Sequence, residues 1–470
     1  MRTLLFVILS LTIAGRSDAA EPWATYRGNP QRTGNTDGKP GPEKPAVLWV
    51  YKSQDNYIAS PVPAGNNVIF SGIGAFNRPN MIGLPMSPKK VVEPAWVRTA
   101  PFLKLPTVSS PAVADGKIVF GDGMHQTDGA ILYCVPADGS YPLWQLQVPG
   151  ELVHLEGAPA IEGKRVYIGG GSAGVLCVEL DKASIEGKEY DLSAIAKMQA
   201  DKWKELEAKY VVDKKKDPDF AMEPSLDNLH KATPKVVWRK GDKKWHVDAP
   251  VCVIGDKVLV ASAFLDKEKV GDRSLYCLKA DTGEELWRSA LGVNPWGGPS
   301  VEGDTVIITG STIAYDPKIL KGAKGEVAAF DLAKGTAKWK KEVPGGVLGC
   351  AALTKDQAIF SCTDGKVRGF ALKDGERRFL YDAKMPLFAP VAVVGDVAYA
   401  ADFKGVVHAI DVKTGAAKWT LDLGTDANVK SPGMVYGGVT VHDGKLFVAT
   451  CNLEGPFARS ATVVVCIGQQ

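Results

Sequence analysis

Short runs of alternating apolar and polar residues recur along most of this chain, separated by turn residues. One type of run appears as SPAVADGKIVF from residue 110, GAPAIEGKRVYI from residue 157 and FAPVAVVGDVAYA from residue 388. Alternation with a period of two, bounded by Gly, Asp and Pro, is typical of β-strands joined by tight turns. The pattern therefore predicts a pair of antiparallel strands that is repeated along the chain.

A second type of run follows each pair after a variable loop. It appears as LKADTGEELW (278–287), AFDLAKGTAKW (329–339) and AIDVKTGAAKW (409–419). The turn glycine supplies the positive φ that a tight hairpin needs, so each run predicts a third and a fourth strand. Four-stranded units that repeat around an axis bury their faces against two neighbours, which predicts a β-propeller.

Aromatic residues of the fourth strands count the repeats. They fall at eight positions: Trp49, Trp96, Trp144, Trp238, Trp287, Trp339, Phe379 and Trp419. Trp49 precedes the first complete repeat, and the last repeat, which ends in ATVVVCIG, has no fourth strand after it. A strand from the N-terminal segment should complete the last sheet and leave no free edge. We predict an all-β, eight-bladed propeller of four-stranded antiparallel blades over residues 46–470, closed by an N-terminal strand.

The third repeat contains an insert at residues 184–235. Leu192, Ile195, Trp203, Leu206 and Tyr210 recur there at helical spacing beside charged residues, which predicts an amphipathic helix between the third and fourth strands of blade three. The favoured interpretation is a helix packed on the propeller. The alternative is a helix that docks a partner.

The N-terminal residues resemble an export leader. Residues 1–19 combine an early Arg, the apolar run LLFVILSLTIAG and small residues near Ala19, which predicts a signal peptide. Residues 20–45 are then a lead-in to the propeller, and the mature protein is expected to be periplasmic or extracellular and soluble, with no membrane span. The net charge of +3 gives no basic field that would favour nucleic acid.

Eight cysteines are present, an even number. Four occupy one repeat position and are interpreted as small buried residues: Cys134, Cys177, Cys277 and Cys466. Cys350 and Cys362 flank the hairpin CAALTKDQAIFSC, where a disulfide and two free thiols both stay open. Since no CxxC, CxxCH or histidine–cysteine spacing occurs, the sequence predicts neither a zinc site nor covalent haem.

Candidate binding residues lie on one face of the predicted ring. Loops between the second and third strands are long there, and function tends to lie on loops held by a rigid scaffold. Residues just before each first strand should line the mouth of the central channel. The candidate ligand-binding residues are Trp245, His246, Asp248, Trp296, His154, Glu156 and Asn428. The alternative is that both tryptophans cap the core and the histidines are solvated.

One motif resembles a catalytic loop. GGGSAG (169–174) matches GxSxG, but it leads from one strand into another, whereas a nucleophile elbow leads from a strand into a helix. Ser172 is therefore predicted to be a turn residue, and no catalytic residue is assigned.

ADTGEELW and VKTGAAKW, after SPAV-type strand pairs, resemble the pyrroloquinoline quinone (PQQ)-type propeller repeat of quinoprotein alcohol dehydrogenases and BamB-like proteins. The resemblance covers about residues 46–468, and WATYRGNPQRTG is similar to the lead-in of many exported members. It implies the propeller fold strongly. It implies function weakly, because turn glycines and packing tryptophans carry it.

Two functions remain open. The favoured one is a non-catalytic binding or scaffolding platform in the cell envelope, with a protein or peptide partner and no cofactor. Carbohydrate binding through exposed aromatics is not separated from it. The alternative is a dehydrogenase that uses PQQ and calcium at the channel mouth. The neighbouring-cysteine pair of many such enzymes is absent from the sequence.

Overall fold

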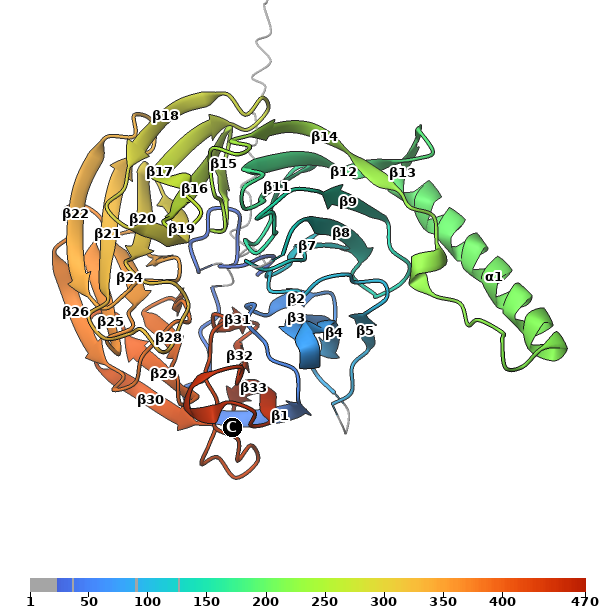
Figure 1. The fold of residues 1–470 in the computed structure, drawn as a ribbon. Coiled ribbons are helices and arrows are strands. Elements are labelled where there is room, and N and C mark those ends of the chain that lie inside the picture. Colours follow the sequence, from blue (N-terminus) through green and yellow to red (C-terminus); the bar gives the residue numbers. More distant parts are fainter. Residues whose placement is uncertain (1–22, 36–37, 89–91, 126) are drawn as a thin grey trace, which may run out of the picture.

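Eight antiparallel sheets form the body of the computed structural model, which describes residues 23–35, 38–88, 92–125 and 127–470. The predicted signal peptide, residues 1–19, lies outside the described residues. The sheets stand around one axis as the blades of a ring (Figure 1). This confirms the predicted eight-bladed β-propeller.

Each blade takes its strands in chain order. Blade one contains β2 (Val62–Ala64), β3 (Asn67–Ile73), β4 (Pro79–Pro85) and β5 (Trp96–Thr99). Blade two contains β6 (Ala112–Ala114), β7 (Lys117–Gly121), β8 (Ala130–Pro136) and β9 (Trp144–Val148). Blade three contains β10 (Ala160–Glu162), β11 (Arg165–Gly169), β12 (Val175–Ile185) and β14 (Thr233–Lys240).

The same order continues through the next four blades. Blade four contains β15 (Cys252–Ile254), β16 (Lys257–Leu265), β17 (Val270–Lys279) and β18 (Glu285–Ala290). Blade five contains β19 (Asn294–Glu302), β20 (Thr305–Ser311), β21 (Lys324–Asp331) and β22 (Ala337–Pro344). Blade six contains β23 (Ala352–Leu353), β24 (Gln357–Ser361), β25 (Lys366–Ala371) and β26 (Arg377–Asp382). Blade seven contains β27 (Ala392–Val394), β28 (Val397–Ala401), β29 (Val406–Asp411) and β30 (Ala417–Asp422).

The eighth blade joins the two ends of the chain. It contains β31 (Thr440–His442), β32 (Lys445–Ala449) and β33 (Thr462–Gln469), and its outer strand is β1 (Pro45–Ser53). β1 pairs antiparallel with β33, with Trp49 opposite Cys466 and Tyr51 opposite Val464. Closure by the N-terminal strand is therefore confirmed.

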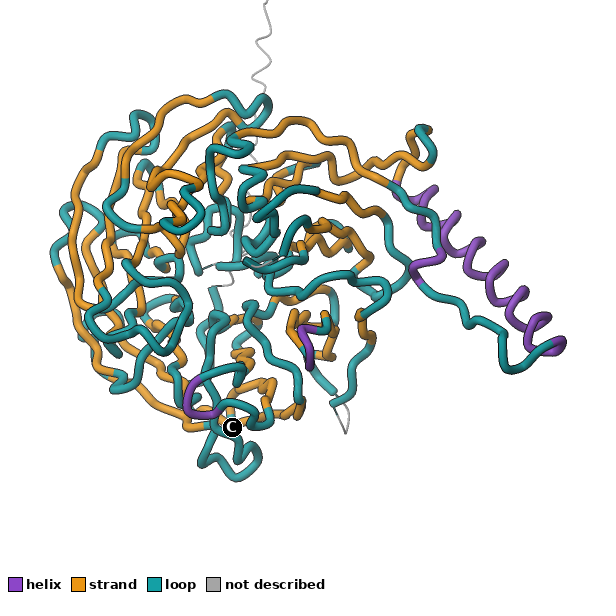
Figure 2. Tube along the Cα trace, in the orientation of Figure 1, coloured by secondary structure: helices purple, strands orange, loops and turns teal. Residues whose placement is uncertain are grey.

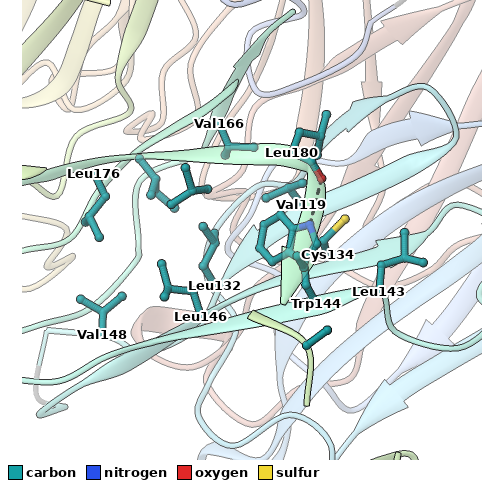
Figure 3. Packing of buried hydrophobic residues seen from close by; sticks show 14 of the residues in the cluster. Val119, Leu132, Cys134, Leu143, Trp144, Leu146, Val148, Val166, Leu176 and Leu180 are labelled. Carbon is teal, nitrogen blue, oxygen red and sulfur yellow. Dashed lines mark hydrogen bonds between the residues drawn. The ribbon is translucent and has the colours of Figure 1, made fainter. Parts of the chain in front are cut away.

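The repeated tryptophans join neighbouring blades. The indole N–H of Trp144 in blade two donates to the carbonyl of Leu180 in blade three at 3.0 Å, within the packed cluster of Figure 3. Trp339 in blade five likewise donates to the carbonyl of Leu372 in blade six at 2.7 Å. Its ring lies against Gly375, whose φ is +69° and where a Cβ would stand 2.7 Å from the indole. The glycine thus serves both the turn and the close approach of the ring.

The lead-in lies inside the ring. Its backbone carbonyls accept hydrogen bonds from the first strands of five blades, on the amides of Val113, Val253, Val301, Leu353 and Val393. Arg32 is fully buried and donates to the carbonyls of Val251, Ala158 and Pro159. Residues 24–34 thereby provide hydrogen-bond acceptors to the first strands of five blades and occupy the centre of the molecule (Figure 1).

The insert of blade three projects from the ring. It consists of β13 (Lys188–Asp191), the helix α1 (Leu192–Lys216) and the 3-10 turn η2 (Leu226–Asn228). Only the first turns of α1 are buried, at Leu192, Ile195 and Gln199, and the rest extends beyond the blades (Figure 2). The helix thus packs on the propeller through its first turns, where Leu192 and Ile195 join the cluster between blades two and three. Among the described residues, no helix has the length and apolar character needed to cross a membrane.

Two further 3-10 turns, η1 (Ala75–Asn77) and η3 (Gly455–Phe457), lie in loops of blades one and eight. Of the two alternatives for Cys350 and Cys362, the structure has the free thiols. The register pairs Ala352 with Ile359 and Leu353 with Ala358. Extended by two residues, it aligns Cys350 with Ser361, and the Cys350 thiol instead donates to the carbonyl of Gly297.

Candidate functional site

Two equivalent connections between blades supply the centre of the site. His154 and Glu156 precede β10 in the segment HLEGAP, and His246 and Asp248 precede β15 in HVDAP. Both segments occupy the same repeat position, just before a first strand. Because the two blades are neighbours in the ring, their His-x-acid pairs lie beside each other.

Asp248 lies between the two imidazoles. Its Oδ1 is 2.7 Å from Nε2 of His154, and its Oδ2 is 2.9 Å from Nε2 of His246. Both histidine side chains are fully buried. Burial opposes ionisation of Asp248, but the two imidazoles outweigh it and hold its pKa well below its usual range. Burial also opposes protonation of His154, yet Asp248 outweighs it and raises the pKa of that imidazole.

Glu156 is the second acid of the site. Burial, followed by the nearby charge of Asp248, raises the pKa of Glu156 to about 7. His154 and a hydrogen bond from the backbone of His125 partly offset this rise. The two carboxyl groups therefore do not ionise equally. Asp248, which lies between the two imidazoles, ionises more readily than Glu156.

The turn between β11 and β12 supports both histidines. Ser172 Oγ lies 3.2 Å from Nδ1 of His246. Gly171 has a φ of +56°, and a Cβ there would stand 3.1 Å from the ring of His154. Ser172 lies in a turn between two strands, as predicted, and it orients His246 while Gly171 leaves room for His154.

His125 completes the site, and sequence reasoning missed it as a candidate. It lies in the exposed loop between β7 and β8 of blade two. Its ring centroid is 5.5 Å from that of His154 and 5.7 Å from that of His246, and those two are 5.2 Å apart. The His-x-acid repeat marks the other residues, but His125 has no counterpart in the repeat that would reveal it.

Three of the predicted site residues lie elsewhere. Trp245 packs between blades against Tyr276, with ring centroids 4.0 Å apart. Trp296 packs against an apolar cluster that includes Phe388 and Met434. Asn428 is exposed in the turn after β30, where its amide N–H donates to Asp426. The structure thus brings together His154, Glu156, His246 and Asp248 but not these three.

These residues do not fit a site for PQQ and calcium. Trp245 is buried and packs against Tyr276, so its indole is not presented as an open face on which a quinone could stack. The donors around Asp248 are mainly imidazole nitrogens, whereas calcium takes oxygen ligands.

Two other chemical roles, a nucleophilic triad and a cation site, can be compared with the arrangement. Ser172, His246 and Asp248 lie in contact in the order of a nucleophilic triad, but the serine is buried and His246 Nε2 has no aligned hydrogen bond to the carboxylate. That geometry does not favour proton relay. One donor atom each from His125, His154, His246 and Asp248 lies within 4.8 Å of all the others. This spacing suits the binding of a cation.

The protein is thus a closed eight-bladed propeller that carries a polar cluster, formed by His125, His154, His246 and Asp248, on its loops and blade connections. The family model described as "Outer membrane protein assembly factor BamB" matches residues 43–213 and 225–386. The chain belongs to this PQQ-like propeller family.

Curated relatives match parts of the chain. The serine/threonine-protein kinase AfsK of Streptomyces griseus is 24% identical over 188 residues, which are 36% of this chain and 23% of the relative. The outer membrane protein assembly factor BamB of Burkholderia pseudomallei is 29% identical over 178 residues, which are 36% of this chain and 41% of the relative. The chain thus spans less than half the length of either.

Solved structures share the fold over nearly the whole chain. BamB from Moraxella catarrhalis has a TM-score of 0.56 at 14% identity and covers 90% of this chain and 97% of its own. A europium-containing methanol dehydrogenase has a TM-score of 0.60 at 12% identity and covers 95% and 98%. An outer membrane protein assembly factor and a dehydrogenase therefore share this architecture, and the likeness shows the fold alone.

Proposed function

We propose that this protein is an exported, non-catalytic binding propeller that receives a protein or peptide partner in the cell envelope. Membership in the BamB family supports a platform role, and the predicted leader at residues 1–19 supports export. The partner is proposed to bind the face that carries the long loops.

Exposed apolar side chains on that face carry the proposal. Phe76 is fully exposed in the loop between β3 and β4. Tyr315 and Ile319 are 44% and 47% exposed between β20 and β21, and Leu453 is 42% exposed between β32 and β33. Loops between second and third strands project from one face of a propeller. Large apolar side chains exposed on loops are typical of protein-binding surfaces.

The surrounding structure favours contact at the surface over entry into the axis. Residues 24–34 occupy the centre of the ring. An ion pair of 3.1 Å between Lys318 and Glu454 joins the loops of blades five and eight. A partner would therefore meet a surface of loops that support each other, and the lead-in at the axis leaves little room for a threaded ligand.

Site-specific photo-crosslinking in the source cells tests this proposal. A benzophenone amino acid replaces Phe76 or Leu453 on the long-loop face, and in matched controls it replaces Leu286 or Leu380, which are 40% and 43% exposed on fourth strands. We expect discrete adducts with an envelope protein at residues 76 and 453 only. Equal adducts at all four positions, or none with correctly folded and exported protein, would refute a partner surface on this face.

A further inference from the structure

We infer that His125, His154, His246 and Asp248 form a binding site for a divalent transition-metal ion of the Zn²⁺ class. The site draws on the loop between β7 and β8 and on the connections before β10 and β15. It is independent of the partner proposed above, since it lies in the polar cluster and not in the exposed apolar loops.

Donor placement is the first argument. Four donor atoms, one from each residue, lie within 4.8 Å of one another. Around a tetrahedral zinc ion with bonds of about 2.0–2.1 Å, neighbouring donors stand about 3.3 Å apart. Small rotations of four side chains, one of them on an exposed loop, would close that gap.

Unpartnered nitrogens are the second argument. Nδ1 of His154 and Nε2 of His246 are buried without a hydrogen-bond partner. Nε2 of His246 is 2.9 Å from Asp248, yet the two are not aligned for a hydrogen bond. A buried polar atom left without a hydrogen-bond partner destabilises the folded protein. A bound cation gives such a nitrogen lone pair a partner that these neighbours do not.

Support around the donors is the third argument. Ser172 contacts Nδ1 of His246 and so leaves Nε2 of that ring for a metal. Metal-binding histidines usually have the other ring nitrogen fixed in this way. Gly171 in the same turn accommodates the ring of His154.

The donor set selects the ion. Three imidazoles and one carboxylate suit Zn²⁺ and its first-row neighbours, whereas Ca²⁺ and Mg²⁺ prefer oxygen ligands. Four protein donors complete a tetrahedral shell and leave no open position, as in structural zinc sites. Such an ion would fasten the loop of His125 to the two connections beneath it.

A buried His–Asp–His cluster without metal is the competing explanation. It needs only His154, Asp248 and His246, since each imidazole already lies within 3 Å of the carboxylate. His125 has no role in that arrangement. Its exposed position makes it the residue to test, because its loss should not disturb folding.

The experiment is a calorimetric titration of chelator-treated full-length mature protein with ZnCl₂, alongside CoCl₂ titration followed by visible absorption. We expect one saturable Zn²⁺ site and a tetrahedral Co²⁺ spectrum. His125→Ala should weaken Zn²⁺ binding by at least about 100-fold, and Ser172→Ala by about 10–100-fold as a positioning residue. His230→Ala removes a half-buried histidine at the insert and should leave binding unchanged.

Three results would overturn the inference. These are no saturable Zn²⁺ binding by correctly folded protein, His125→Ala binding zinc like the unaltered protein, and stronger binding of CaCl₂ than of ZnCl₂. Melting temperatures measured with and without ZnCl₂ separate lost binding from lost folding, since only a protein that holds the ion is stabilised by it.

Discussion

At the scale of single residues, Asp122 shows how a buried carboxyl group makes stability depend on pH. Its Oδ1 accepts from the amide of Ile131 at 2.5 Å, and its Oδ2 accepts from the hydroxyl of Tyr133 at 3.0 Å and the amide of Leu105 at 3.3 Å. Burial outweighs these bonds and raises the pKa of Asp122 from 3.8 to about 6. Between those values the folded protein holds a proton that the unfolded chain has lost.

Asp122 should therefore lower the free energy of unfolding as the pH rises from about 4 to 6. A pKa that is raised on folding contributes stability below the unfolded value and loses it on passing the folded value. The shift corresponds to about 3 kcal/mol. Urea unfolding of the protein and of Asp122→Asn, from pH 4 to pH 7.5, checks this. The difference in the free energy of unfolding between the unaltered protein and Asp122→Asn should change by up to that amount over this range, with the unaltered protein relatively more stable at low pH. A constant difference would contradict the prediction.

The site residues show which contacts a sequence reveals. His154 with Glu156 and His246 with Asp248 were predicted to be candidates, because each pair precedes a first strand at the channel mouth. Trp245 occupies a similar position but packs against Tyr276. A position in the repeat predicts the path of the backbone, but it does not predict whether the side chain points into the core. His125 could be recognised as a site residue only from the conformation of its loop, because no local sequence spacing predicts that conformation.

At the scale of elements, the tryptophan of the fourth strand should be a main source of stability. Trp339 is 8% exposed, packs on Gly375 and donates to Leu372. Trp339→Ala should lower the free energy of unfolding by about 3–5 kcal/mol. Trp339→Phe keeps most of the packing and leaves the carbonyl of Leu372 unpaired, which should cost about 1–3 kcal/mol. Chemical denaturation measures both.

The half-buried Trp287 is the matched control for this prediction. It occupies the same repeat position and donates to Leu332 at 3.0 Å. Because more of its ring stays in water, Trp287→Ala should cost less than Trp339→Ala. Equal losses would mean that the burial of the ring does not set its contribution, and no loss at Trp339 would mean that its indole does not hold the blades together.

The strands were predictable because the alternation of apolar and polar residues and the turn glycines are local signals that recur in every repeat. Elements outside the repeat were harder to predict. The apolar positions of α1 predicted an amphipathic helix correctly, but spacing alone does not say how much of a helix meets the propeller. The hairpin between Cys350 and Cys362 was predictable, but its register, which depends on the exact turn, places Cys350 one residue away from alignment with Cys362.

At the scale of the whole molecule, the N-terminal segment serves the ring twice. β1 closes the eighth blade, and this was predictable because the last repeat lacks a fourth strand. The path of residues 24–34 through the centre was not predictable. Those residues carry no strand pattern, and their role depends on inner edges that exist only after all the blades have assembled.

Deleting residues up to 34 should therefore open the centre of the ring while keeping its closure. β1 stays, but the amides of Val113, Val253, Val301, Leu353 and Val393 lose their acceptors. We expect a folded, less stable protein in which these amides exchange hydrogen much faster, while the amide of Cys277, between two strands of blade four, stays protected. Arg32→Met, which retains the backbone acceptors, should lower stability and leave the five amides protected. Unchanged exchange in the deletion variant would mean that the lead-in fills the centre without supporting it.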